Sequence, residues 1–130
     1  MASVLLAEDT AATRAAIMLI LQSAGHSVET AADGESAIAC FSPERHDLAV
    51  LDIWLPKQSG LDVLRFIRDQ RSDFPVVVMS GGGPGATLEQ ASLMADLYRA
   101  DRILYKPFDD EELLGAIRDL LDSRRAGGGS

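Results

Sequence analysis

Cysteine, long apolar runs and basic residues are all scarce in this chain of 130 residues, and each shortage excludes a class of protein. The single cysteine, Cys40, rules out an intramolecular disulfide, and its helical-looking surroundings predict a small packed side chain. No apolar run approaches the roughly 18 residues of a membrane span, and the N-terminus lacks the basic segment of a signal peptide. We therefore expect a cytoplasmic protein without membrane contact.

The charge balance is acidic, with 12 Lys and Arg against 20 Asp and Glu and a formal net charge of −8. Nucleic-acid binding depends on clustered basic side chains, so this composition predicts no direct contact with nucleic acid and favours cations as ligands. Hydrophobic residues make up 47% of the chain and charged residues 25%, as in ordered globular proteins. The length fits one domain, which we place at residues 1–123, followed by a flexible tail at 124–130.

Short apolar runs alternate with longer amphipathic stretches along the chain. The short runs are predicted to be five strands, at residues 3–7, 27–31, 48–52, 75–80 and 101–105. The longer stretches are predicted to be helices, at residues 10–25, 33–41, 59–71, 86–98 and 109–123. The first, third and fourth strands are apolar nearly throughout, as expected when helices cover both faces of a parallel sheet. The pattern therefore predicts an α/β fold, a doubly wound sheet of (βα)5 units.

Polar side chains stand at the carboxyl ends of four predicted strands, where ligands bind in doubly wound sheets. Glu8 and Asp9 follow the first strand, and Asp52 ends the third. Ser80 ends the fourth strand, and Lys106 follows the fifth. Because an ionised carboxylate is costly to bury, we expect Asp52 at an exposed strand end. These side chains should converge in one cleft.

Clustered carboxylates form a site of hard oxygen ligands that suits Mg²⁺. Beside such an ion, Asp52 can act as a nucleophile toward phosphorus and form an aspartyl phosphate. Lys106 would stabilise charge on the phosphoryl oxygens, and Ser80 would donate a hydrogen bond to the group. His26 and His46 lie in turn segments and are not expected to carry the phosphoryl group.

The segments VLLAED, LAVLDIWLPKQSGLDVL, VVVMSGG and ILYKPF, in this order, resemble the receiver domains of bacterial two-component response regulators. The resemblance extends over about residues 3–123 and implies the flavodoxin-like strand order 2-1-3-4-5. It implies that Asp52 is the phosphoacceptor and that Lys106 precedes a cis proline. It further implies a metal site made by Glu8, Asp9, Asp52 and the carbonyl of Trp54. Ser80 and Lys106 would contact the phosphoryl group.

The resemblance also implies partners and an activity. The phosphoryl donor would be a sensor histidine kinase or a histidine phosphotransfer protein. A downstream protein would bind the face formed by the helix at 86–98, the strand at 101–105 and the helix at 109–123. The receiver would catalyse its own phosphorylation and dephosphorylation, without turning over a substrate as an enzyme does.

Two features depart from the family pattern, and two other functions remain open. Ile103 stands where the family usually has an aromatic residue, and residues 81–85 are unusually rich in glycine, which leaves the switching mechanism open. One alternative function is a receiver-like interaction module that is never phosphorylated, although such a module normally lacks an acid or the lysine. The other is a Mg²⁺-dependent phosphohydrolase with an aspartyl-phosphate intermediate, which needs a second acid at the position of Trp54.

Overall fold

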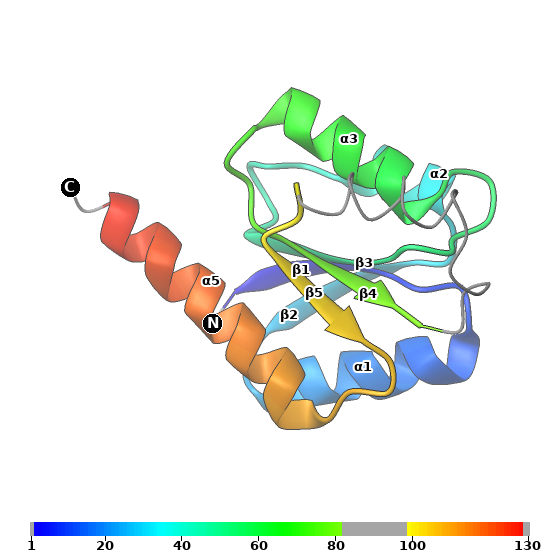
Figure 1. Cartoon of the computed structure of the whole chain (residues 1–130), viewed down its shortest axis with the longest axis horizontal. Coiled ribbons are helices and arrows are strands. Elements are labelled where there is room, and N and C mark those ends of the chain that lie inside the picture. The colour runs from blue at the N-terminus through cyan, green and yellow to red at the C-terminus, as the bar shows by residue number, and fades with distance from the viewer. Residues whose placement is uncertain (1, 82–98, 129–130) are drawn as a thin grey trace.

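The computed structural model describes residues 2–81 and 99–128, which form one sheet flanked by helices (Figure 1). The strands are β1 (Ser3–Ala7), β2 (Ser27–Ala31), β3 (Leu48–Asp52), β4 (Val76–Ser80) and β5 (Arg102–Tyr105). The helices are α1 (Ala11–Ser23), α2 (Gly34–Cys40), α3 (Gly60–Gln70) and α5 (Asp110–Gly128). Neighbouring strands are parallel, in the order β2-β1-β3-β4-β5. The predicted fold class and strand order are confirmed.

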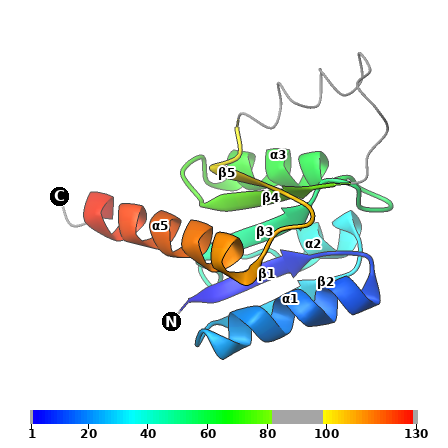
Figure 2. The same ribbon diagram turned by 60° about the horizontal axis from the view of Figure 1, so that its bottom comes forward.

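Helices cover both faces of the sheet, α2 and α3 on one and α1 and α5 on the other (Figures 1 and 2). Successive side chains of a strand point to opposite faces. In β1, Leu5 accordingly packs in the core cluster that includes residues of α2 and α3, and Leu6 packs in the cluster that includes residues of α1 and α5. In β3, Leu51 packs in the first of these clusters and Val50 packs in the second. Burial on both faces is the reason that these central strands are apolar except at Ser3 and Asp52.

The helix starts are fixed by local hydrogen bonds. The Ser59 side chain accepts the Asp62 N–H at 3.2 Å, and the Asp62 carboxylate accepts the Ser59 N–H at 3.1 Å, which is a capping box at the start of α3. Asp33 caps α2 by accepting a backbone N–H of its first turn at 2.6 Å. Thr10 stands at the N-cap of α1, but its side chain makes no capping bond. Beyond α1, Gly25 turns the chain toward β2 with a φ of 92°, a conformation that glycine adopts without strain.

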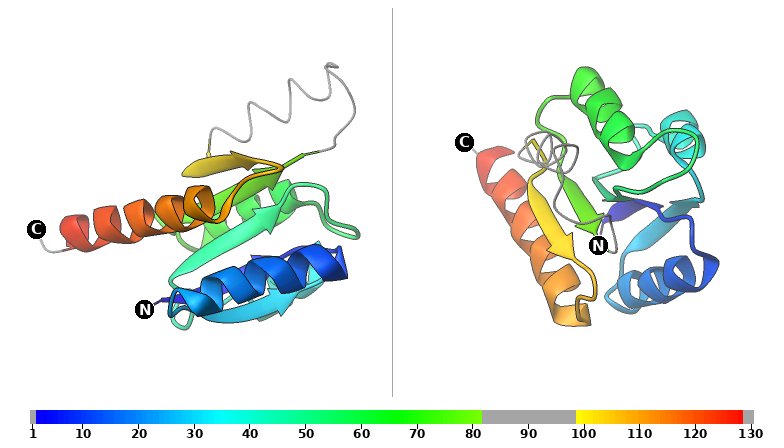
Figure 3. Two further views of the ribbon diagram at one scale, coloured as in Figure 1. Left: turned by 90° about the horizontal axis from the view of Figure 1, so that it is seen from below. Right: turned by 45° about the vertical axis from the view of Figure 1, so that its right-hand side comes forward.

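Helix α5 is longer than the sequence predicts. The predicted helix ends at residue 123, whereas α5 continues to Gly128. The division into a domain at 1–123 and a flexible tail at 124–130 stays a prediction. Arg and Ala, which occupy positions 124–126, are strong helix formers, and basic residues interact favourably with the C-terminal end of a helix. The C-terminal part of α5 projects past the sheet (Figures 2 and 3).

Two sequence predictions concern segments outside the described residues. The predicted helix at 86–98 and most of the glycine-rich run at 81–85 fall in this part of the chain. Within residues 2–81 and 99–128, no helix is both long and apolar enough to cross a membrane. The cytoplasmic location stays a prediction.

Candidate functional site

Strand β1 delivers two carboxylates to the carboxyl edge of the sheet. Glu8 follows β1 directly, and its N–H donates to the Ala31 carbonyl at 3.0 Å, so the pairing with β2 extends to this residue. Glu8 is only 1% exposed, whereas the next residue, Asp9, is exposed. The Oε2 atom of Glu8 accepts the Thr10 N–H at 3.1 Å, which holds the carboxylate at the start of α1.

Asp52 ends β3 at the centre of the sheet, between β1 and β4. The sequence predicts an exposed strand end, but Asp52 is only 6% exposed, so that prediction is wrong. Two donors compensate the burial, because Oδ1 accepts the Trp54 N–H at 2.8 Å and Oδ2 accepts a hydrogen bond from Lys106 Nζ at 2.6 Å. A buried charge is tolerated when it is paired and hydrogen-bonded, and Asp52 is both.

Gly60 brings the start of α3 against the backbone of Asp52. Its N–H donates to the Ile53 carbonyl at 3.0 Å, which closes the turn between β3 and α3. A Cβ at this position would overlap the Asp52 carbonyl oxygen and lie 2.7 Å from the Cα of Ile53. The absence of a side chain at Gly60 therefore allows the turn to hold Asp52 where it is.

Lys106 follows the edge strand β5 and joins two of the acids. Its N–H donates to the Ser80 carbonyl at 2.8 Å, which aligns it with the end of β4. Its Nζ lies 2.6 Å from Glu8 Oε1 and 2.6 Å from Asp52 Oδ2, while 28% of its side chain remains exposed. The Lys106–Pro107 peptide bond is cis, as the resemblance implies.

Ser80 and Trp54 complete the set of predicted residues at this edge. Ser80 ends β4, is half-buried, and pairs in register with Tyr105 of β5. Trp54 lies two residues beyond Asp52 and is 39% exposed. The structure thus brings every predicted site residue to one edge of the sheet, with Lys106 in contact with Glu8 and Asp52.

Glu8, Asp9 and Asp52 form a cluster that could hold a metal ion. One carboxylate oxygen from each residue lies within 4.8 Å of the others. Mg²⁺ takes oxygen ligands, is usually bound by few carboxylates, and keeps several of its waters. Two buried carboxylates beside an exposed one fit an ion that stays partly hydrated.

The site shifts the pKa of two of its groups. Burial raises the pKa of Glu8 above its usual 4.5, and the charge of Asp52 adds to this effect, although hydrogen bonds from Lys106 and Thr10 oppose it. Burial by itself lowers the pKa of Lys106, but hydrogen bonds to Asp52 and Glu8 outweigh it, and the net pKa lies above the usual 10.5. Lys106 is therefore a permanent cation at neutral pH.

The chain matches a known family over most of its length. The family model of the response regulator receiver domain matches residues 4–118. The chain belongs to this family. The two-component response regulator PhoP of Pseudomonas aeruginosa is 36% identical over 124 residues, which cover 95% of this chain and 52% of the relative. This receiver thus spans about half the length of the curated relatives it matches.

Solved receiver structures have the same fold. The CheY-like receiver of Methanospirillum hungatei superimposes with a TM-score of 0.85 at 27% identity, and the match covers 98% of each chain. TrrA of Thermotoga maritima, solved in complex with Mg²⁺-BeF, superimposes with a TM-score of 0.78 at 29% identity. That match covers 92% of this receiver and 99% of TrrA. The predicted family is confirmed.

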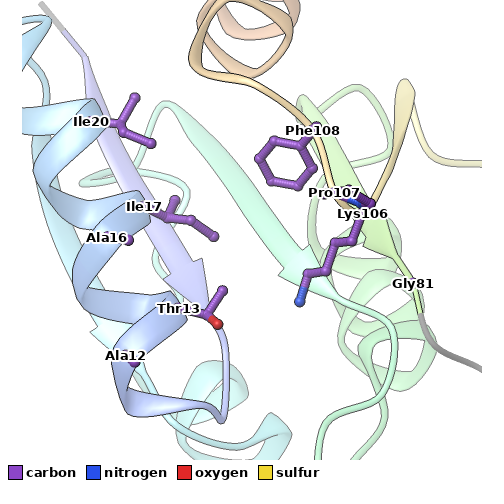
Figure 4. A pocket seen from close by; sticks show the side chains of 9 residues that line it. All are labelled: Ala12, Thr13, Ala16, Ile17, Ile20, Gly81, Lys106, Pro107 and Phe108. Carbon is purple, nitrogen blue, oxygen red and sulfur yellow. The ribbon is translucent and has the colours of Figure 1, made fainter.

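An apolar groove adjoins Lys106, and the sequence analysis did not predict it. The groove has a volume of about 670 Å³ and lies between α1 and the segment that carries Lys106 and Phe108 (Figure 4). Ala12, Ala16 and Ile20 line it from α1. Their spacing of four residues, which places them on one side of a helix, is the signal that the sequence offers.

Proposed function

We propose that this receiver accepts a phosphoryl group on Asp52 in a Mg²⁺-dependent reaction. One observation carries the proposal: the buried carboxylate of Asp52 lies 2.6 Å from the Lys106 ammonium and has an oxygen within 4.8 Å of those of Glu8 and Asp9. A nucleophile, a fixed cation and a set of metal ligands are thereby combined at one point.

In the proposed reaction, an oxygen of Asp52 attacks the phosphorus of the donor and forms a new O–P bond. The bond between phosphorus and the leaving atom of the donor breaks, and that atom keeps the electron pair. Lys106 stabilises the negative charge on the phosphoryl oxygens, because its ammonium is already in contact with Asp52 Oδ2. The Ser80 hydroxyl, at the end of the neighbouring strand, donates a hydrogen bond to the bound phosphoryl group.

The carboxylates of Glu8, Asp9 and Asp52 would hold the Mg²⁺, with the carbonyl of Trp54 as a further ligand. The ion supplies positive charge to the phosphoryl oxygens. Asp9 is exposed and so offers a ligand that a hydrated ion can reach from solvent. The Trp54 N–H donates to Asp52 Oδ1 at 2.8 Å, which keeps this residue beside the site.

The proposed donor is a sensor histidine kinase or a histidine phosphotransfer protein, whose phosphohistidine must come next to Asp52. The groove beside Lys106 offers such a donor an apolar surface, and Leu19 of α1, which is 64% exposed, adds to the apolar surface of this helix. For a downstream protein we propose the face to which β5 and α5 contribute, where Tyr105 is 56% exposed.

We propose that the receiver unit at residues 1–123 works through protein contacts. Within this range, α5 is anchored to the core by buried side chains that include Leu113, Ile117 and Leu120. The absence of direct nucleic-acid contact stays a prediction, because the chain covers only about half of its curated relatives.

No observation favours the alternative functions. A phosphohydrolase of the aspartyl-phosphate type needs an acid two residues after the nucleophile, and Trp54 stands there. A module that is never phosphorylated would not need the full set of acids with the lysine in contact, and here Lys106 contacts both Glu8 and Asp52.

Phosphorylation by acetyl phosphate tests the proposal. We expect mass spectrometry to find one phosphoryl group, on the peptide that contains Asp52, and only when Mg²⁺ is present. Asp52→Asn should abolish the mass increase, whereas Asp69→Asn, which changes an exposed acid of α3, should retain it. A label on His26 or His46, or labelling that does not require Mg²⁺, would overturn the assignment.

A further inference from the structure

Arg14, in the first turns of α1, reaches back to the turn that carries the acid pair. Its Nη1 donates to the Glu8 carbonyl at 2.9 Å and to the Asp9 carbonyl at 3.5 Å. The side chain is half-buried, and its own N–H donates to the Thr10 carbonyl at 2.8 Å as part of α1. One guanidinium therefore ties the backbone of both acids to the helix that follows them.

The turn between β1 and α1 has few other supports. Thr10 provides no side-chain cap, and its own N–H donates to Glu8 Oε2, an oxygen of one of the proposed metal ligands. An oxygen that accepts a backbone N–H has less capacity to bind a cation. The bonds from Arg14, in contrast, end on carbonyl oxygens and leave the carboxylates of Glu8 and Asp9 available.

We propose that Arg14 is a positioning residue for the Mg²⁺ site, a role that rests on the function proposed above for Asp52. It fixes the backbone of Glu8 and Asp9 so that their carboxylates face Asp52, within 4.8 Å of its carboxylate, without neutralising them. One guanidinium nitrogen has two N–H groups in a fixed plane, one for each carbonyl. The ammonium of lysine, on a flexible stem, offers no such fixed geometry.

The experiment measures Mg²⁺ binding by the fluorescence of Trp54, the single tryptophan, which is 39% exposed beside Asp52. Removal of a residue that orients metal ligands weakens metal binding by roughly 10- to 100-fold. We expect about a tenfold higher Kd for Mg²⁺ in Arg14→Ala, and a smaller increase in Arg14→Lys. The matched control is Arg118→Ala, which removes an exposed arginine of α5 and should leave the Kd unchanged.

The rate of phosphorylation by acetyl phosphate, measured against Mg²⁺ concentration, separates positioning from other roles. Arg14→Ala should need more Mg²⁺ for half of its maximal rate and should regain the wild-type rate at saturation. Urea unfolding of each variant shows whether it is folded under the assay conditions. If Arg14→Ala is unfolded, the Kd of Arg14→Lys for Mg²⁺ tests the role of Arg14 instead.

Three results overturn the inference in distinguishable ways. If the wild-type protein does not respond to Mg²⁺, the proposed function fails and this role fails with it. If the wild type binds Mg²⁺ and the folded Arg14 variants bind it equally well, only the role of Arg14 is wrong. If the Kd is unchanged but the rate at saturating Mg²⁺ falls, Arg14 acts on the reaction itself and is not a positioning residue.

Discussion

Replacement of Lys106 by methionine tests the central contact of the site. The Lys106 ammonium lies 2.6 Å from an oxygen of Glu8 and 2.6 Å from an oxygen of Asp52. The side chains of these two acids are only 1% and 8% exposed, respectively. Lys106→Met keeps most of the length of the side chain and its apolar character but removes the charge, so two buried carboxylates are left without their shared cation.

The expected loss of stability follows from burial. Removal of one partner from a fully buried ion pair costs about 3–5 kcal/mol. Here 28% of the lysine side chain is exposed, so water replaces part of its charge, and the backbone N–H groups of Thr10 and Trp54 still donate to the two acids. We therefore expect the free energy of unfolding at pH 7, without divalent cations, to fall by about 2 kcal/mol.

Urea unfolding measures this change, and Lys57→Met is the matched control. Lys57 is the only other lysine of the chain, and its side chain is 60% exposed at 3.7 Å from Asp33. An exposed pair of this kind contributes little to stability. Mg²⁺ should restore much of the stability of Lys106→Met and should bind it more tightly than the wild type, because the competing ammonium is gone.

A specific pair of results would refute this reasoning. If Lys106→Met loses no more stability than Lys57→Met, the two acids do not depend on Lys106 for their charge compensation. If its Kd for Mg²⁺ also equals that of the wild type, the ammonium does not compete for the carboxylate oxygens. Lys106 would then not compensate the charges of Glu8 and Asp52.

Two further predictions concern the backbone of the site and its pH dependence. Gly60→Ala forces a Cβ onto the Asp52 carbonyl oxygen. The free energy of unfolding measured in urea should therefore fall by about 1–3 kcal/mol, and acetyl phosphate should label Asp52 more slowly. If both values are unchanged, Gly60 does not lie as close to the Asp52 backbone as the structure shows. Burial raises the folded-state pKa of Glu8 above 4.5, so Glu8 binds a proton more readily in the folded state than in the unfolded state. Its contribution to stability is therefore fully present below pH 4.5 and is lost as the pH rises through the folded-state pKa. The stability difference between wild type and Glu8→Gln, measured by urea unfolding from pH 4.5 to 7, should therefore shift against the wild type as the pH rises, and a shift in the opposite direction would contradict the raised pKa.

The sequence predicts the sheet well because the physical signal is local. A strand buried on both faces is mostly apolar, and the runs at 3–7 and 48–52 are apolar apart from Ser3 and Asp52 at their ends, with the bounds found in the structure. The end of α5 was missed because the glycines at 127–129 indicate a helix stop, whereas the preceding arginines and alanine favour helix. These opposing preferences are small, and the sequence does not decide between them.

The residues proposed from the sequence for the site lie at one edge of the sheet, but their contacts were not predicted. The exposed environment expected for Asp52 is wrong because the cation that compensates its burial comes from Lys106, which is 54 positions away in the sequence. The sequence predicts that these side chains meet in one cleft, but it does not show that the ammonium contacts the Asp52 carboxylate directly and compensates its burial. The bonds from Arg14 were missed for a different reason, because an arginine in an amphipathic helix gives no signal that it points back to the preceding turn.

The charges of the cluster explain why the proposed reaction should require a divalent cation. Three carboxylates, from Glu8, Asp9 and Asp52, share their edge of the sheet with the ammonium of Lys106, so a surplus of two negative charges remains when all are ionised. The raised pKa of Glu8 is consistent with an environment that opposes ionisation even before a phosphoryl group is added. A phosphoryl group on Asp52 adds further negative charge at the same point. Lys106 is already shared between two acids, so the added charge needs a second cation, and the exposed carboxylate of Asp9 is where a hydrated ion can enter.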